Sequence, residues 1–314
     1  LDNNLQTATT PETPFDNSYR AGEELIQSFP NYEQIGDVYS RLIDISVDIY
    51  KDLERAKTWF RDMQNRPQLQ IPAYLLYAEG RIALFEKDFT RARQALTRAE
   101  RQSDETNLSE KARYFLSLSD FFSEDYEFAE VQLKSMERRT SSYYANDAIK
   151  LRMWIKNGMR ADTTGQVLDA VSRSMYQLHT GKYEEAMTEA EPLLATSGNT
   201  FADDLVLEFS TRLPTTYDAV ILKLLNHVIE AQPTSPVRER LLWDRAALIE
   251  ERSETGWSTA ISTNPFTFLE SDTVPSYSEE ELVALYEEML MEYPDGFYAN
   301  YIREKLRTLE SRSI

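Results

Sequence analysis

The sequence predicts an all-α fold, an α-solenoid of helix-turn-helix repeats with one long inserted loop. The main evidence is a repeated phrase in which a turn is followed by an aromatic residue or leucine and, three residues later, by alanine. Its copies begin at Lys51, Lys87, Glu124 and Gly181. Ala56, Ala92 and Ala129 lie 36 and 37 residues apart, a period typical of stacked helix pairs. The 9 glycines in 314 residues and the abundance of helix-forming side chains agree with this fold.

Apolar periodicity and turn residues predict the helices in chain order, after helical signals that start near Ala21. Asn31 follows a proline and is a candidate N-cap, and Pro67 and Pro72 separate the first helix pair from the second. The predicted helices cover residues 31–50, 52–65, 73–86, 89–103, 108–123, 126–139, 143–159, 166–180, 183–196, 200–212, 216–231, 237–251, 278–293 and 297–311.

Four segments follow from this pattern. Residues 1–18 are rich in Asn, Thr and Pro and are expected to form a flexible tether. Residues 19–251 form the predicted solenoid, and residues 278–314 continue it as a C-terminal helix pair. Between them, residues 252–277 form the inserted loop, in which 10 of 26 residues are Ser or Thr. This loop either folds back on its own solenoid or binds a partner.

The chain carries a net charge of −19, which is unevenly distributed. Residues 250–295 hold twelve acidic side chains and one basic, whereas residues 81–160 hold thirteen acidic and fifteen basic. A polyanion repels phosphate, so nucleic acid and anionic lipid are not expected partners. The acidic segment either meets a basic partner or serves solubility. No stretch has the roughly 18 apolar residues of a membrane-spanning helix.

The repeats resemble tetratricopeptide repeats. In the best copy, Leu76 and Gly80 occupy the first helix, Phe89 and Ala92 open the second, and Leu96 follows. The small residues let the two helices approach while the large ones fill the space around them. The resemblance covers residues 31–250 at varying strength, and the closing proline of the family is missing from most units. It implies an α-solenoid that binds other proteins.

Residues 285–309 are similar to the Tyr-Pro-Asp-Ser repeat of bacterial envelope proteins such as the outer-membrane assembly lipoprotein and the Tol–Pal coordinator. Tyr293, Pro294, Asp295 and Phe297 carry the similarity, while Gly296 stands where Ser is usual. The resemblance implies an extracytoplasmic location in a bacterium, periplasmic or at the cell surface. The N-terminal tether would then carry a lipid or protein anchor. The alternative for this terminus is a frayed chain end.

The search for chemistry is negative. The chain lacks cysteine, phosphate-binding glycine loops and known catalytic motifs, and its two histidines, His179 and His227, do not have metal-ligand spacing. Acidic residues of the 278–293 helix are interpreted as a solvated face. We therefore expect no enzyme, no cofactor and no metal site. A hydrolase that acts on glycans through two carboxylates remains the lesser alternative.

The predicted function is a non-catalytic scaffold that binds proteins of the envelope through a groove and the acidic C-terminal region. The predicted contacts are aromatic and basic, and inter-repeat packing would use the same residue types. They are Tyr74, Tyr77, Arg81, Lys111, Tyr114, Phe122 and Trp257. The alternative is self-assembly into rings or filaments, in which the acidic segment of one copy contacts the Arg-rich segment of the next.

Overall fold

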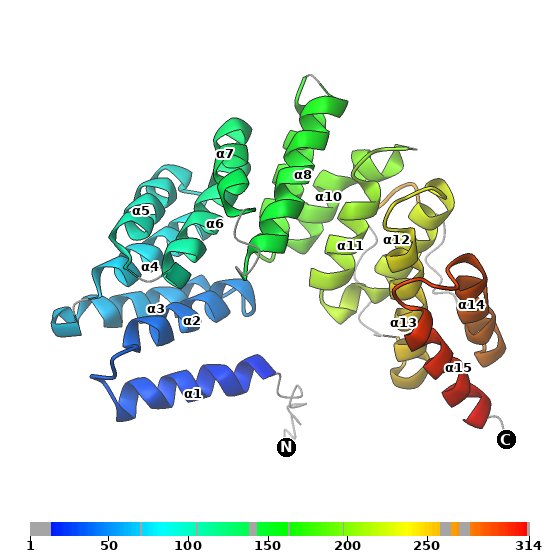
Figure 1. The fold of residues 1–314 in the computed structure, drawn as a ribbon, viewed down its shortest axis with the longest axis horizontal. Helices are drawn as coiled ribbons and strands as arrows, with labels where there is room; N and C mark the ends of the chain where they lie inside the picture. The colour runs from blue at the N-terminus through cyan, green and yellow to red at the C-terminus, as the bar shows by residue number, and fades with distance from the viewer. Residues whose placement is uncertain are drawn as a thin grey trace, which may run out of the picture. The chain divides into compact units, whose positions relative to one another are not determined.

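The computed structural model describes residues 14–69, 71–104, 106–137, 143–162, 164–196, 198–257, 265–269 and 277–312. Within these ranges the regular structure consists of fifteen α-helices and two short 3-10 helices, and no strand occurs (Figure 1). The all-α prediction is therefore confirmed. The chain divides into two compact units. The N-terminal unit contains Leu1–Lys156 and His179–Gly181, and the C-terminal unit contains Asn157–Leu178 and Lys182–Ile314.

In the N-terminal unit each helix from α1 to α6 packs on the next one along the chain, and α2, α4 and α6 also pack on one another in turn. The apolar side chains of neighbouring helices are buried against one another. The first helices of successive pairs, α2, α4 and α6, thereby lie together. The helices are α1 (Pro14–Ser28), α2 (Ile35–Asp48), α3 (Leu53–Gln64), η1 (Pro67–Leu69), α4 (Pro72–Phe85), α5 (Phe89–Gln102), α6 (Thr106–Phe122), α7 (Tyr126–Met136) and α8 (Ala145–Ala161), the last of which extends past the unit boundary.

The repeated phrase marks the turn inside each pair. Its first residue has positive φ in all four copies, at Lys51, Lys87, Glu124 and Gly181. This left-handed residue ends the first helix, as a C-terminal glycine commonly does. In the first two copies the next residue is an aspartate whose side chain accepts a hydrogen bond from the backbone N–H three residues on. One short phrase thus ends one helix and begins the next.

Helix α1 corrects the expected tether. The helix begins at Pro14, so residues 14–18 are helical rather than part of a tether that extends to residue 18. Proline is favoured in the first helical turn, and Asp16 adds negative charge there. Tyr19 and Ile26, spaced seven residues apart, are buried and hold α1 on the unit. Residues 1–13 lie outside the described residues.

The C-terminal unit continues the pairwise packing of neighbouring helices. Its helices are α9 (Gln166–His179, of which His179 groups with the N-terminal unit), α10 (Tyr183–Ala195), α11 (Ala202–Arg212), η2 (Thr215–Tyr217), α12 (Asp218–Ala231), α13 (Arg238–Thr255), α14 (Glu279–Glu292) and α15 (Ala299–Arg312). Ser278 and Glu281 form a reciprocal capping box at the start of α14. Three glutamates in its first turn further favour this helix end.

Of the predicted inserted loop, residues 252–255 instead form the last turn of α13, so the helix runs further than predicted, and residues 265–269 pack on the other helices of the C-terminal unit. Phe266 is buried, and Phe268 lies against His227 of α12 with ring centroids 4.8 Å apart. Glu191 of α10 accepts hydrogen bonds from the backbone and hydroxyl of Thr267, at 2.8 and 2.5 Å. Residues 258–264 and 270–276 of this loop lie outside the described residues.

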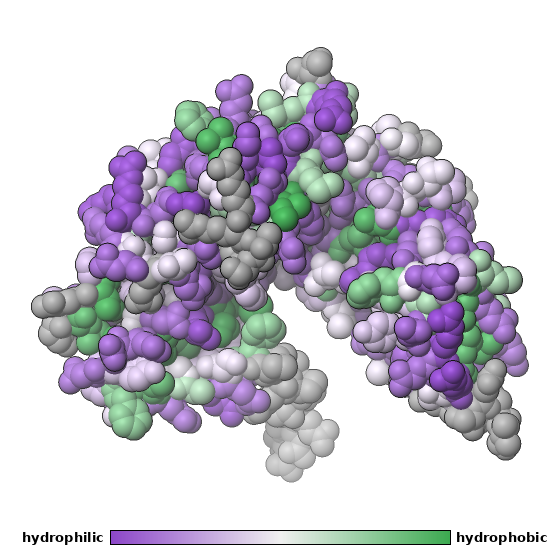
Figure 2. Space-filling model, in the orientation of Figure 1, coloured by the Kyte–Doolittle hydropathy of each residue, from purple (hydrophilic) through white to green (hydrophobic). Residues whose placement is uncertain are grey.

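The visible face of both units is largely hydrophilic, with small hydrophobic areas between the polar ones (Figure 2). Among the helices that the structure describes, none is both long and apolar enough to cross a membrane. Several large apolar side chains are nevertheless exposed, among them Phe128 and Val131 on α7 and Phe297 at the α14–α15 joint.

Candidate functional site

A cluster of buried charges joins α2, α4 and α6. The side chain of Arg81 is fully buried. Its Nη2 lies 2.6 Å from Oδ1 of Asp48 and its Nη1 lies 3.2 Å from Oδ1 of Asp44. The guanidinium carbon stands 3.4 Å from the centroid of the Phe115 ring, a cation–π contact in a water-poor site. One cation of α4 is thus held by two carboxylates of α2 and a ring of α6.

Two further side chains complete this cluster around Asp44. The hydroxyl of Tyr77 donates to Oδ1 of Asp44 at 2.7 Å, and Nζ of Lys111 lies 3.4 Å from its Oδ2. Burial raises the pKa of Asp44 above its ordinary value, against the opposing effect of the two cations. Burial also acts to raise the pKa of Asp48, but Arg81, His179 and Lys51 hold it below its ordinary value. Two cations and two anions make the cluster formally neutral.

The structure therefore brings three of the predicted contact residues together, Tyr77, Arg81 and Lys111, but assigns them to an internal ionic cluster. Tyr77 and Arg81 are fully buried, and Lys111 is 13% exposed. Sequence reasoning did not find their partners Asp44 and Asp48. The available signal was their spacing of four residues, which places both carboxylates on one face of α2.

The other predicted residues are more scattered. Tyr74 is buried, with its ring against the backbone of Gly36. Phe122 is buried beside His179, at a ring distance of 5.7 Å. Tyr114 is half-buried and stacks on Tyr144 at 4.6 Å. Trp257 is half-buried just beyond the end of α13, in the C-terminal unit.

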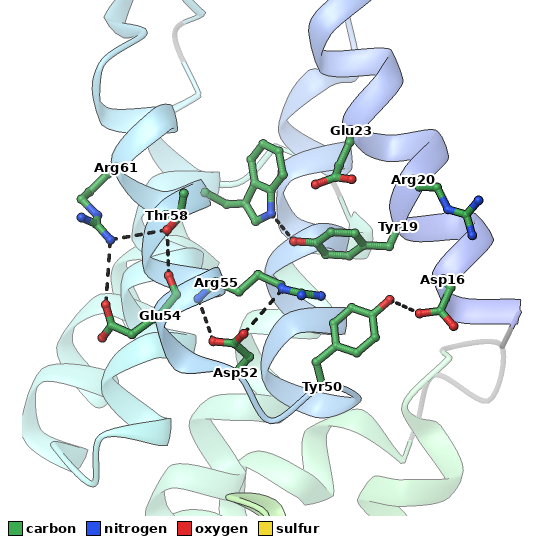
Figure 3. A pocket seen from close by; sticks show the side chains of 11 residues that line it. Asp16, Tyr19, Arg20, Glu23, Tyr50, Asp52, Glu54, Arg55, Thr58 and Arg61 are labelled. Atoms are coloured by element: carbon green, nitrogen blue, oxygen red, sulfur yellow. Dashed lines mark hydrogen bonds and ion pairs between the residues drawn. The ribbon is translucent and has the colours of Figure 1, made fainter. Parts of the chain in front are cut away.

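A pocket of about 630 Å³ lies between α1 and the α2–α3 turn (Figure 3). Three aromatic rings, of Tyr19, Tyr50 and Trp59, line it and meet edge to face. Hydrogen bonds fix the rings: the indole Nε1–H of Trp59 donates to the Tyr19 hydroxyl at 2.6 Å, and the Tyr50 hydroxyl donates to Asp16 at 2.6 Å. Burial and this bond to Asp16 raise the pKa of Tyr50 to about 12.

Charged groups of both signs surround the rings. The guanidinium of Arg55 lies 4.5 Å from the centroid of Tyr50 and 5.2 Å from that of Tyr19. Its one ion pair among the described residues is with Asp52, at 3.6 Å. Glu23 makes no hydrogen bond or ion pair with another described residue, and Figure 3 shows its carboxylate above the Tyr19 ring. Sequence reasoning missed this pocket because α1 was assigned in part to the tether.

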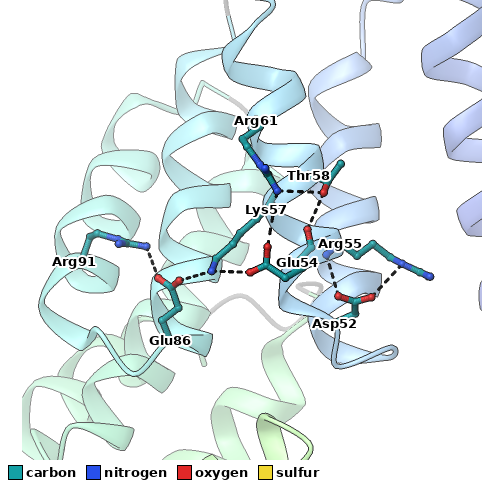
Figure 4. A network of polar contacts seen from close by, with 8 residues as sticks. All are labelled: Asp52, Glu54, Arg55, Lys57, Thr58, Arg61, Glu86 and Arg91. Carbon is teal, nitrogen blue, oxygen red and sulfur yellow. Dashed lines mark hydrogen bonds and ion pairs between the residues drawn. The ribbon is translucent and has the colours of Figure 1, made fainter.

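A network of ion pairs on α3 adjoins the pocket and shares Glu54 and Arg61 with its lining (Figure 4). Lys57 pairs with Glu54 at 3.1 Å and with Glu86 of the next pair at 2.9 Å, and Glu86 also pairs with Arg91 at 2.8 Å. Arg61 lies 3.9 Å from Glu54. These pairs are partly or largely exposed, so each contributes little stability. The Lys57–Glu86 pair links α3 to the next helix pair.

A second aromatic cluster lies at the C-terminal helix pair. Trp243 of α13 and Tyr298 stack at 4.8 Å with planes 10° apart. Phe297 and Tyr301 contact this stack and are 75% and 55% exposed. Large aromatic surfaces of this kind are common at protein interfaces when they are held rigidly. The C-terminal unit thus presents aromatic rings outward, next to an acidic helix.

The departure at Gly296 has a structural reason. A Cβ at this position would collide with the carboxylate of Glu239, which accepts a hydrogen bond from the backbone N–H of Tyr298 at 2.9 Å. The joint therefore needs glycine so that Glu239 can approach and fix the Tyr298 ring beside Trp243.

Both histidines pack against aromatic rings. His227 packs on Phe268, with Nε2 3.2 Å from the Leu194 carbonyl, and His179 packs between Phe85 and Phe122. Within the described ranges, no group of three or more His, Asp or Glu side chains is placed to hold a metal ion. Comparison with protein-family models, with curated proteins and with solved structures found no match to this chain.

Proposed function

We propose that this protein is a non-catalytic scaffold that binds other proteins, built as a tetratricopeptide-like α-solenoid and located in the bacterial cell envelope. The observation that carries the proposal is the outward-facing aromatic pair Phe297 and Tyr301. Both rings rest on the Trp243–Tyr298 stack, so their ordering costs little entropy on binding. Exposed aromatic rings on a rigid base are typical anchors of protein interfaces.

Several features support the scaffold role. The repeated turn, with a left-handed residue in each of four copies, is what a helix-pair array needs. The acidic side chains of α14, the helix that packs on α15, would orient a basic partner and speed its association. The Tyr-Pro-Asp motif at the α14–α15 joint supports the envelope location, through its similarity to envelope repeats.

The scaffold role is tested with Phe297→Ser/Tyr301→Ser in the native cell. We expect proteins that co-purify with the wild type after chemical cross-linking to be lost from this variant, while Phe15→Ser/Tyr32→Ser, which alters exposed aromatic rings of the N-terminal unit, retains them. The same set of proteins on both variants would contradict the proposal.

A second candidate is self-assembly, and one observation favours it. Phe128 and Val131 are 63% and 70% exposed on one face of α7, and Arg93 lies over the Phe128 ring. This exposed apolar face would pack against the rings of Phe297 and Tyr301 in a second copy, while basic side chains of residues 81–160 meet the acidic side chains of residues 250–295. Light scattering at about 50 mM and about 500 mM salt tests it, since salt screens such contacts. A monomer at both concentrations would exclude assembly, and an oligomer that dissociates at high salt would support it.

A further inference from the structure

The pocket between α1 and the α2–α3 turn has no part in the proposed scaffold role. It is of a size that small ligands commonly occupy, about 630 Å³, and has the aromatic lining of such sites. Its rings are held in fixed positions by hydrogen bonds between Trp59 and Tyr19 and between Tyr50 and Asp16. The pocket is therefore formed before any ligand arrives, which lowers the entropy lost on binding.

The charges that line the pocket indicate the chemistry of the ligand. Four carboxylates and three guanidinium groups face it, so the lining is nearly neutral. The carboxylates are Asp16, Glu23, Asp52 and Glu54, and the guanidinium groups are Arg20, Arg55 and Arg61. An anion would meet the four carboxylates and a cation the three arginines. An apolar ligand would take water away from these charges, and Glu23, which has no partner among the described residues, would lose its hydration without compensation, which is costly.

A ligand that is neutral and rich in hydroxyl groups avoids each of these conflicts. A hydroxyl both donates to a carboxylate and accepts from a guanidinium group. The aromatic rings then offer apolar faces to the C–H groups of the same molecule. Only a molecule with alternating C–H faces and hydroxyl edges uses both features. We propose that this pocket binds a neutral carbohydrate, with a sugar ring against Trp59 and Tyr50 and its hydroxyls on Glu23, Arg55 and Arg61.

Glu23 and Arg55 would make the strongest contacts. Glu23 has no partner among the described residues, so its carboxylate can accept two hydroxyls without losing an existing bond. Arg55 is fixed over two tyrosine rings and 42% exposed, and its ion pair with Asp52 is long at 3.6 Å. Arg61 is 63% exposed at the rim, where it donates hydrogen bonds to the Lys57 carbonyl and the Thr58 hydroxyl, so a ligand hydroxyl would share or replace these contacts.

The test follows the indole N–H signals of the four tryptophans in ¹⁵N-labelled full-length protein. The Trp59 signal is identified by its loss in Trp59→Phe. Maltose, cellobiose, lactose and mannobiose serve as neutral probes, with arginine and inorganic phosphate as charged probes. We expect a saturable shift of the Trp59 signal with at least one disaccharide and none with arginine or phosphate.

Matched variants connect the shift to the pocket. Glu23→Gln and Arg61→Gln should each lower the affinity for the disaccharide by about tenfold, since each removes a charged hydrogen-bond partner. Glu287→Gln, on α14 of the C-terminal unit, should leave the affinity unchanged. Circular dichroism shows whether each variant keeps its helices. A shift with phosphate or arginine alone, no shift with any disaccharide, or equal affinity in all three variants would overturn the proposal.

Discussion

Two regions of this protein that are rich in aromatic and charged side chains differ in how deeply those side chains are buried. Around Arg81, cations and anions are paired with one another inside the N-terminal unit, and the cation is fully buried. At the C-terminal pair, Phe297 and Tyr301 face outward and only the base of their cluster is packed. The residue types are similar, but burial differs. Residue type therefore identifies side chains that are suited to binding a partner. Burial decides which of these side chains a partner can reach.

The comparison is tested most strongly at Arg81. Arg81→Met removes a buried cation and leaves Asp44 and Asp48 without their main partner. We expect the free energy of unfolding of the N-terminal unit to fall by about 3–5 kcal/mol. Hydrogen exchange of the α4 amides measures it.

The substitution to compare with Arg81→Met is Phe297→Ser in the C-terminal aromatic cluster. Since this ring is 75% exposed, we expect a change within about 0.5 kcal/mol for the C-terminal unit. Equal losses in the two variants would mean that the two regions do not differ as described.

A smaller effect is expected at the glycines that permit close packing. A Cβ on Gly80 would lie 2.5 Å from Cγ of Leu96, between α4 and α5, so Gly80→Ala should cost about 1–3 kcal/mol. Glu79→Ala on the same helix is the control and should be nearly neutral. At Gly296 a Cβ would meet the carboxylate of Glu239 and, at 2.9 Å, the Cβ of Tyr293, so Gly296→Ala should perturb the Trp243–Tyr298 stack, seen by near-UV circular dichroism. An unchanged spectrum would contradict this account of the joint.

The repeated turn predicts a pair of opposite effects. Gly181 has φ +78°, and a Cβ there would lie 2.9 Å from Cγ of Lys51, so Gly181→Ala should lose about 1–2 kcal/mol. Lys87 has φ +66° without being glycine, so Lys87→Gly should gain up to about 1 kcal/mol. Thermal unfolding of both variants checks this. A gain in the first or a loss in the second would be inconsistent with left-handed turns.

The smallest effect concerns acid pH. The hydrogen bonds from Thr267 lower the pKa of Glu191 below its ordinary value of 4.5. A carboxylate with a lowered pKa in the folded state contributes stability that is complete above its unfolded pKa and is lost as pH falls through the folded pKa. The amide signal of Thr267 should therefore shift with a midpoint below pH 4.5, while the helices persist. A midpoint at or above 4.5 would show that this contact does not form.

The sequence predicted the positions of the helices better than the burial and contacts of individual side chains. Period and turn residues located every helix from α2 to α15, and at four of the turns the repeated phrase both ends one helix and begins the next. The start of α1 was misplaced because Thr and Pro before it resemble a tether, although Pro14 is a normal first helical residue.

Burial of the candidate residues could not be predicted. Arg81 and Lys111 look like surface cations until α2 brings Asp44 and Asp48 against them, and that contact depends on packing between helix pairs. The pocket of Tyr19, Tyr50 and Trp59 was likewise not visible, since its walls come from three separate segments. Predictions from residue type alone, without the partner helices, do not separate internal clusters from open ones.

The central claim is that partner proteins contact Phe297 and Tyr301 of the C-terminal unit. They are not expected to contact the predicted residues on α4 and α6 of the N-terminal unit, such as Tyr114. Photo-crosslinking in the native cell tests it directly, with benzoylphenylalanine placed at Tyr301 or at Tyr114, which is half-buried and stacked on Tyr144. We predict discrete crosslinked proteins from position 301, abolished by Phe297→Ser, and none from position 114. Crosslinks from position 114 with none from position 301 would contradict the claim.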